Sequence, residues 1–133
     1  MTHSLRRIAI WIDQREAIVA VFSGDRLRKE EEIFSDIDQE THHKKWTRNH
    51  IQAHKHEHLK HFYEEVVQHF GPADEILILG PGQAKHELHH HVEHHKGLKG
   101  KVTAVENVGK MSETELVAHA TTFFKLDQHV FQK

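Results

Sequence analysis

The sequence predicts a single α/β domain with a mixed sheet. Three strand-like runs come first, and strands then alternate with helices through the rest of the 133 residues. A chain of this length holds one ordinary hydrophobic core and is too short for two typical domains, so we expect residues 1–133 to form one domain. Alternating strands and helices require crossover connections, which place parallel strands in the sheet and helices against its faces.

The three opening runs are typical of strands. Residues 8–12 are continuously apolar, as in a strand covered on both faces, and we place them in the middle of the sheet. Residues 17–22 are β-branched or small, end in an aromatic residue, and are followed by a Ser-Gly-Asp turn signal. Residues 27–34 are crowded with charged side chains, which suits an edge strand that must not pair with another chain. Together the three runs predict a meander.

A long helix is predicted after the meander, because no glycine or proline occurs between residues 42 and 70. In its second half, apolar side chains recur at spacings of three and four and form one core-facing stripe. They are Leu59, Phe62, Tyr63, Val66 and Phe70. Upstream, the same positions hold Lys55, Gln52 and Arg48. The first half therefore has little to bury, and we expect it to project beyond the sheet or to be partly loop.

The second half of the chain continues the alternation. Residues 75–79 predict a buried strand, 83–95 a second helix, and 101–108 a fifth strand. Ser112 and Glu115 have the spacing of a capping box at the start of a third helix. The resulting order βββαβαβα, with a mixed five-stranded sheet between two helical layers, is that of ribonuclease H-like folds.

Composition excludes several functional classes. The absence of cysteine removes disulfides, thiolate metal sites and cysteine nucleophiles. No apolar run approaches the roughly 20 residues of a membrane helix, and the N-terminus lacks the apolar stretch of a secretory signal, so we expect a cytoplasmic protein. The 18 Lys and Arg against 20 Asp and Glu do not indicate a nucleic-acid binder. The unusual feature is the 17 histidines, which mild acid would turn into positive charges.

Two groups of histidines have spacings that are compatible with binding a metal ion. His86-Glu87-Leu88-His89-His90 matches H-E-x-x-H, in which two histidines bind zinc and the glutamate acts as a base. In so histidine-rich a chain the match arises readily by chance, and a core-facing Leu88 leaves His86 and His90 on the solvated side, so we expect no metalloprotease. A second stripe on the long helix could chelate Zn or Ni. It consists of His50, His54, His58 and His61. The alternative is a solvated face that becomes cationic as pH falls. We expect such chelation to be adventitious and expect no cofactor.

Two further features have both a chemical and a structural interpretation. Asp13 follows the first central strand, where ribonuclease H-like nucleases hold a metal-binding carboxylate. A two-metal site needs several convergent acids, so we expect Asp13 to cap the following turn. The turn Gly80-Pro81-Gly82 leads into a helix whose free N–H groups could hold a phosphate, with Lys85 nearby. The P-loop pattern is absent, which favours a tight structural turn.

Local charge is more informative than total charge. Between residues 42 and 61, five basic side chains accompany a single acid, Glu57. Residues 96–110 hold four lysines and one acid. Basic segments with a stackable aromatic side chain suit RNA phosphates and splayed bases, although a solvated charged face explains the composition equally well. The candidate RNA contacts are Lys44, Lys45, Trp46, Arg48, Lys55 and Lys60.

Residues 8–19, 59–70 and 76–85 match, in order and spacing, segments of a known domain. The chain resembles the central domain of the archaeal and eukaryotic peptide-chain release factors and Pelota, and it is more similar still to bacterial stand-alone relatives of that domain. The resemblance spans about residues 7–125. It implies a ribonuclease H-like "translational machinery component" fold, in agreement with the order of the elements.

One departure from that family limits the function. In release factors, a loop before the long helix carries Gly-Gly-Gln, which enters the peptidyl-transferase centre, whereas residues 38–48 here lack it. The resemblance therefore implies docking on ribosomal RNA through the basic tip, without hydrolysis of peptidyl-tRNA. We expect a non-catalytic ribosome- or RNA-binding protein, monomeric or homodimeric, whose binding weakens with salt and strengthens from about pH 8 to 6. A histidine-rich metal-binding protein is the alternative hypothesis, and a metal-dependent nuclease is the third.

Overall fold

The strands of the described residues form one mixed sheet. The computed structural model describes residues 5–35 and 48–126, the latter without the side chains of residues 48–56. The strands are β1 (Arg6–Ile12), β2 (Glu16–Ser23), β3 (Arg26–Phe34), β4 (Glu75–Gly80) and β5 (Val102–Asn107). Their order in the sheet is β3-β2-β1-β4-β5. The first three pair antiparallel, and β1–β4 and β4–β5 pair parallel. This confirms the predicted mixed sheet with the first strand at its centre.

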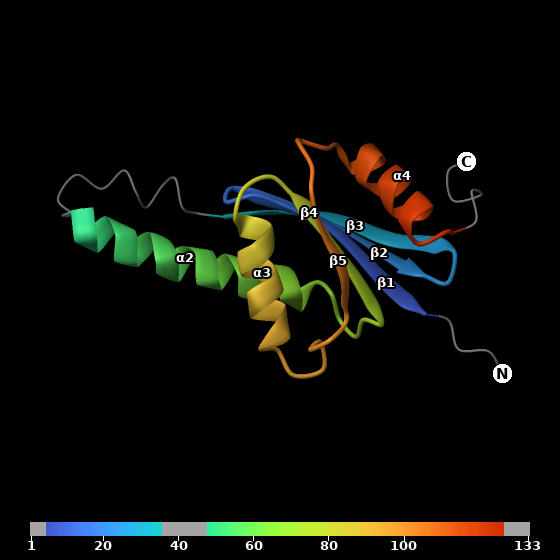
Figure 1. The fold of residues 1–133 in the computed structure, drawn as a ribbon, viewed down its shortest axis with the longest axis horizontal. Helices are drawn as coiled ribbons and strands as arrows, with labels where there is room; N and C mark the ends of the chain where they lie inside the picture. Colours follow the sequence, from blue (N-terminus) through green and yellow to red (C-terminus); the bar gives the residue numbers. More distant parts are fainter. Residues whose placement is uncertain (1–4, 36–47, 127–133) are drawn as a thin grey trace.

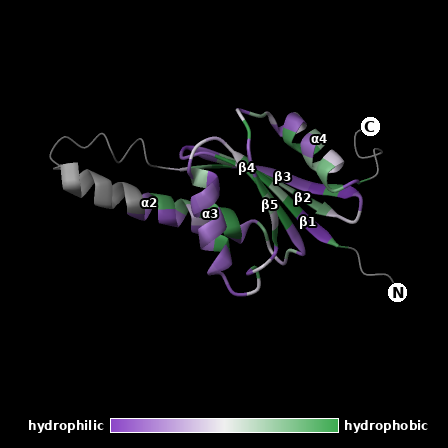
Figure 2. Ribbon diagram, viewed as in Figure 1, coloured by the Kyte–Doolittle hydropathy of each residue, from purple (hydrophilic) through white to green (hydrophobic). Residues whose placement is uncertain are grey.

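Helices cover both faces of the sheet (Figure 1). They are α2 (Arg48–Gln68), α3 (Ala84–Glu93) and α4 (Glu113–Phe123). Successive side chains of β1 alternate between the faces. Ile8 and Ile10 belong to the core shared with α2 and α3, and Ala9 and Trp11 belong to the core shared with α4. The central strands are therefore buried on both sides, which explains their unbroken apolar sequence, visible as the green centre of Figure 2.

The helix ends follow local chemistry. The predicted capping box of α4 is present: the Ser112 hydroxyl accepts from the Glu115 backbone N–H at 3.1 Å, and the Ser112 N–H donates to the Glu115 carboxylate at 2.8 Å. Helix α3 (Ala84–Glu93) is shorter than the predicted 83–95. It ends because His94, with a φ of −96° and a ψ of 4°, leaves the helical conformation. None of the helices in the described part of the chain is long and apolar enough to cross a membrane.

Strand β3 is the charged edge that the sequence predicts. It pairs only with β2 among the described strands, and most of its side chains are exposed. Ile33 is its one buried residue and joins the core under α2. Charged side chains on such an edge oppose pairing with another sheet.

Candidate nucleic-acid interface

Helix α2 has an inner half that packs on the sheet and an outer half that extends past it (Figure 1). In the inner half the predicted apolar stripe is confirmed, because Leu59, Phe62, Tyr63 and Val66 are buried in the core. In the outer half, which begins at Arg48, the helix continues although polar residues occupy the positions of the apolar stripe. The absence of glycine and proline lets the backbone stay helical there. The result is a helical protrusion that begins at Arg48.

Three of the six predicted RNA contacts lie on α2, two of them on its protruding half. Arg48 opens α2, and Lys55 lies two turns further along the same helix. Lys60 is exposed on the inner half. Lys44, Lys45 and Trp46 lie outside the described residues. The structure therefore places three of the six predicted contacts on one helix.

The predicted metal-binding histidines all lie on α2. His58 is half-buried and His61 is exposed, whereas the side chains of His50 and His54 are outside the described part. Over the residues that the structure describes, no group of three or more His, Asp or Glu side chains is arranged to hold a metal ion. A metal site on α2 stays a prediction from spacing.

A row of polar contacts joins α2 to α3. The Tyr63 hydroxyl donates to Glu87 Oε1 at 2.5 Å. Glu64 accepts from His91 Nε2 at 2.8 Å and from His95 Nε2 at 3.3 Å, while Gln68 donates to the same carboxylate at 2.6 Å. Burial and the bond to Glu87 raise the pKa of Tyr63 far above its ordinary value. The hydrogen bond from His91 lowers the pKa of Glu64. This polar seam, made of Tyr63, Glu64, Gln68, Glu87, His91 and His95, joins α2 to α3 beside the hydrophobic core that the two helices share.

We expect Glu64→Gln to loosen this seam in a pH-dependent way. Because the pKa of Glu64 is lowered in the folded protein, its contribution to stability is present above the unfolded pKa and disappears as pH falls through the folded pKa. The side chain is 42% exposed, so solvent limits the effect to about 1 kcal/mol or less. Urea unfolding at about pH 6 and at about pH 4 measures the difference. The exposed Glu65→Gln is the matched control, and an equal loss in both variants would contradict the prediction.

A buried lysine side chain stabilises the turn between β4 and α3. Lys85 is 5% exposed, and its ammonium group donates to the Gly82 carbonyl at 2.5 Å and to Asn107 Oδ1 at 3.3 Å. Gly80 lies so close to β1 that a Cβ atom would overlap the Ile12 carbonyl oxygen. These contacts tie the ends of β4 and β5 together. They support the structural interpretation of the turn, because the Lys85 ammonium is already engaged by the protein.

Asp13 and the H-E-x-x-H segment also have structural partners. Asp13 Oδ1 accepts from the backbone N–H groups of Arg15 and Glu16 at 2.8 and 2.9 Å, which is the predicted capping of the turn. In the H-E-x-x-H segment, Glu87 accepts from Tyr63, and His86 and His90 are exposed on the outer face of α3. Neither arrangement is that of a catalytic metal centre within the described residues.

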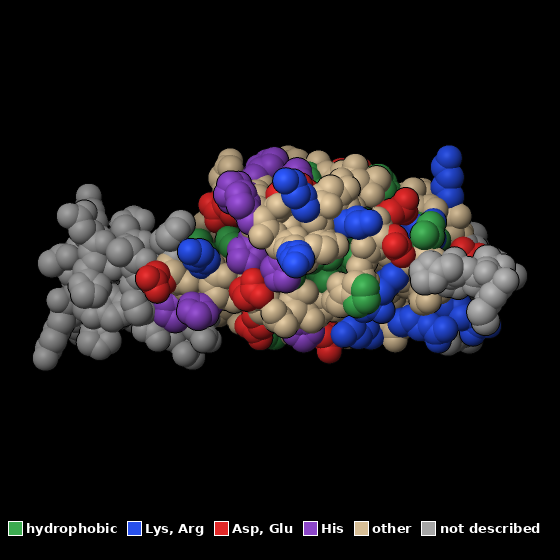
Figure 3. All heavy atoms as spheres, turned by 90° about the horizontal axis from the view of Figure 1, so that it is seen from below, with side chains coloured by type: hydrophobic (Ala, Val, Ile, Leu, Met, Phe, Trp, Pro, Cys, Tyr) green, Lys and Arg blue, Asp and Glu red, His purple; other side chains and the backbone are tan. Residues whose placement is uncertain are grey.

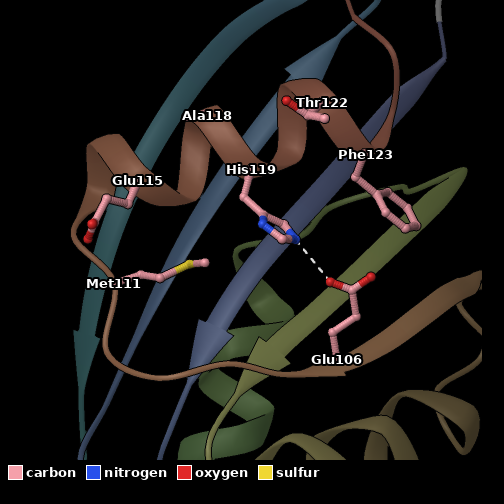
Figure 4. Close-up of a pocket in the computed structure, with 7 residues that line it drawn as sticks. All are labelled: Glu106, Met111, Glu115, Ala118, His119, Thr122 and Phe123. Atoms are coloured by element: carbon pink, nitrogen blue, oxygen red, sulfur yellow. Dashed lines mark hydrogen bonds and ion pairs between the residues drawn. The ribbon is translucent and has the colours of Figure 1, made fainter.

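A groove beside α4 is a feature that the sequence does not predict. It has a volume of about 540 Å³ and lies between α4 and the end of β5 (Figure 4). His119 Nε2 contacts Glu106 Oε1 at 2.9 Å across it. Met111 and Phe123 supply its apolar wall. Glu106 and His119 are distant in sequence and follow no motif, so nothing in the sequence indicates the pair.

The fold and the sequence together place the chain in a protein family. A family model matches residues 4–123, and its family is bacterial archaeo-eukaryotic release factor family 10. The chain belongs to this family. Membership confirms the resemblance predicted from the sequence and supports a role linked to translation. Among curated proteins, no match is found.

Three solved structures of archaeal proteins resemble this chain in fold. The Thermoplasma acidophilum Pelota protein is 15% identical, with a TM-score of 0.59 over 90% of this chain and 33% of that chain. The archaeal translation termination factor aRF1 is 18% identical, with a TM-score of 0.55 over 91% and 35%. Archaeoglobus fulgidus Pelota is 11% identical, with a TM-score of 0.58 over 91% and 32%. The family 10 chain thus spans about a third of each, and the likeness shows that it shares a fold with one part of these proteins.

The sequence of the family 10 protein lacks the motif that the resemblance associates with hydrolytic release factors. No Gly-Gly-Gln occurs anywhere in it. The stretch before α2 instead carries Lys44, Lys45 and Trp46. In the sequence, these basic and aromatic residues occupy the segment that the resemblance aligns with the release-factor loop.

Proposed function

We propose that this family 10 protein binds ribosomal RNA without catalysing a reaction. The observation that carries the proposal is the outer half of α2, which extends past the sheet (Figure 1). It holds Arg48 and Lys55 and directly follows Lys44, Lys45 and Trp46. A narrow basic protrusion can approach the RNA backbone more closely than a flat face of the sheet. Membership in a release-factor family supports the ribosome as the partner.

The proposed mechanism is electrostatic docking with one aromatic contact. Lysine and arginine side chains of the protrusion neutralise phosphates and release counterions. Trp46 stacks on an unpaired base. Without Gly-Gly-Gln the docked protein does not hydrolyse peptidyl-tRNA. We propose that it acts in the cytoplasm, needs no cofactor, and works as a monomer or homodimer.

Salt dependence tests this mechanism with purified components. Untagged protein is pelleted with ribosomes at monovalent salt from about 50 to about 200 mM. With four or five phosphate contacts, we expect the logarithm of the binding constant to fall with the logarithm of salt at a slope of about −3 to −4. Undetectable binding at low salt, or a slope near zero, would refute docking through phosphates.

A metal-binding function is the alternative, and it rests on the spacing of four, four and three residues between His50, His54, His58 and His61 on α2. We expect untagged protein purified without a nickel column to carry only traces of Zn or Ni. Elemental analysis measures this directly. A stoichiometric ion that disappears in a His54→Gln/His58→Gln variant would instead establish the alternative.

A further inference from the structure

The outer face of α3 and the residue that caps its C-terminus carry a line of histidines. His86, His90 and His94 are spaced one helical turn apart, and all three are exposed. The imidazole rings of His90 and His94 lie 4.4 Å apart between centroids. His94 Nδ1 donates to the His90 carbonyl at 2.9 Å, which leaves Nε2 of His94 available to another partner. In the described part of the chain, none of the three imidazoles pairs with a carboxylate.

The loop after α3, which follows the histidines in the sequence, carries lysines. Lys96 and Lys99 are exposed, and Lys101 is half-buried at the start of β5. Within the described ranges these three form no ion pair. Lys110, further along, differs because it contacts Glu16 and lies 4.5 Å from the centroid of the Trp11 ring. Figure 3 shows histidine side chains over α2 and α3 on one side of the molecule, with both basic and acidic side chains beside them.

The acidic side chains near this line have other partners. Glu87 accepts from Tyr63, and Glu93 accepts from the Gly100 N–H at 3.2 Å and lies 3.6 Å from His89. On α2, Glu64 is bonded to His91 and His95. The remaining charged groups of α2 on the described surface are Glu57, Lys60 and Glu65, with His58 and His61 between them.

The charge of this surface depends on pH. With neutral histidines, its three lysines are nearly balanced by Glu87 and Glu93. Histidine side chains gain a proton between pH 8 and 5. Protonation of the three outer imidazoles would add up to three positive charges along about two helical turns. The positive charge of this surface therefore increases as the pH falls.

We propose that this surface is a second RNA contact that proton uptake switches on. The histidine–lysine surface consists of His86, His90, His94, Lys96, Lys99 and Lys101. The inference rests on the proposed function, because it adds a pH-regulated contact to RNA already bound through α2. RNA fits better than a membrane, since the large exposed apolar side chains of the described part are Leu5, next to β1, and Phe34, at the end of β3. A membrane-binding surface needs such side chains on its own face.

Binding of a fluorescein-labelled single-stranded RNA, measured by anisotropy at about pH 7.8 and about pH 6, tests the inference. EDTA in the buffer removes transition metals that exposed histidines would chelate. The test variant combines His86→Gln, His90→Gln and His94→Gln, which keeps polar side chains at exposed positions. The control is His119→Gln, on α4 at the opposite face of the sheet.

We expect the wild-type affinity to rise about tenfold or more at the lower pH, and the slope of binding against salt to steepen by about two. The triple variant should lose most of this gain and keep its affinity at pH 7.8, and His119→Gln should keep the gain. The inference is overturned if the triple variant gains as much as the wild type, if the wild type shows no gain, or if phosphatidylglycerol vesicles bind equally well at pH 6.

Failure of the proposed function has a different signature. It would appear as weak binding at pH 7.8 that is unaffected by changes at Lys44, Lys45 and Arg48. Failure of the inference leaves binding at pH 7.8 intact and changes only the response to acid. The two outcomes are therefore separable within one set of titrations.

Discussion

Gly80→Ala is expected to destabilise the protein by about 4 kcal/mol or more, or to prevent folding. Gly80 ends β4 and lies beside the end of β1, where a Cβ atom would overlap the Ile12 carbonyl oxygen. Its φ of +153° is also a conformation that side chains disfavour. Both strands are in the middle of the sheet and buried on both faces, so neither backbone can move away without disturbing the core.

Gly82→Ala is the matched control two residues later. Gly82 also has a positive φ, +62°, but a Cβ atom there would meet no heavy atom within 4 Å. Its substitution should therefore cost only about 1 kcal/mol of backbone strain. Urea unfolding of both variants measures the difference. Similar stabilities for the two variants would show that the contact with Ile12 relaxes easily, contrary to this prediction.

The sequence predicts the sheet well because its strands are patterned by burial. The apolar run at 8–12 and the charged run at 27–34 are enough to distinguish a central strand from an edge strand. The stripe from Leu59 to Phe70 likewise indicates which half of α2 packs. Its loss upstream correctly suggests that the first half projects, although spacing alone could not decide between helix and loop.

The contacts between elements are harder to predict. Glu64 meets His91 and His95 because two helices cross at a particular register, and no local pattern encodes that register. The position of Lys85 after a glycine-rich turn is compatible with phosphate binding. In the structure, however, its ammonium group donates a hydrogen bond to the Gly82 carbonyl. The candidate interface could be proposed from the sequence alone, because its basic residues and its tryptophan lie close together along the chain, between residues 42 and 61. Recognising them needs no knowledge of contacts between elements.

Charge reversal at the protrusion is the second change with a large expected effect. A variant with Lys44→Glu, Lys45→Glu and Arg48→Glu should bind ribosomes at least about a hundredfold more weakly at low salt, because three phosphate contacts become repulsions. Its salt slope should also become shallower by about two to three. Its unfolding transition should change little, because these residues lie outside the packed half of α2. Ribosome pelleting at several salt concentrations measures both the affinity and its dependence on salt.

The control for charge reversal is a triple variant on β3. Arg26→Glu, Arg28→Glu and Lys29→Glu change the net charge by the same amount at exposed positions of the edge strand. They belong to the first half of β3, and β3 begins at the end of the sheet far from the protrusion (Figure 1). The β3 variant should keep most of the wild-type affinity. Equal losses in the two variants would mean that net charge, and not the protrusion, controls binding.

Sedimentation of the untagged protein from native lysate through a sucrose gradient tests the central claim most directly. We predict co-migration with ribosomal particles at low salt, release at high salt, and loss of co-migration after RNase treatment. Migration only as a small free species under all these conditions would contradict ribosome binding and leave the family fold without this function.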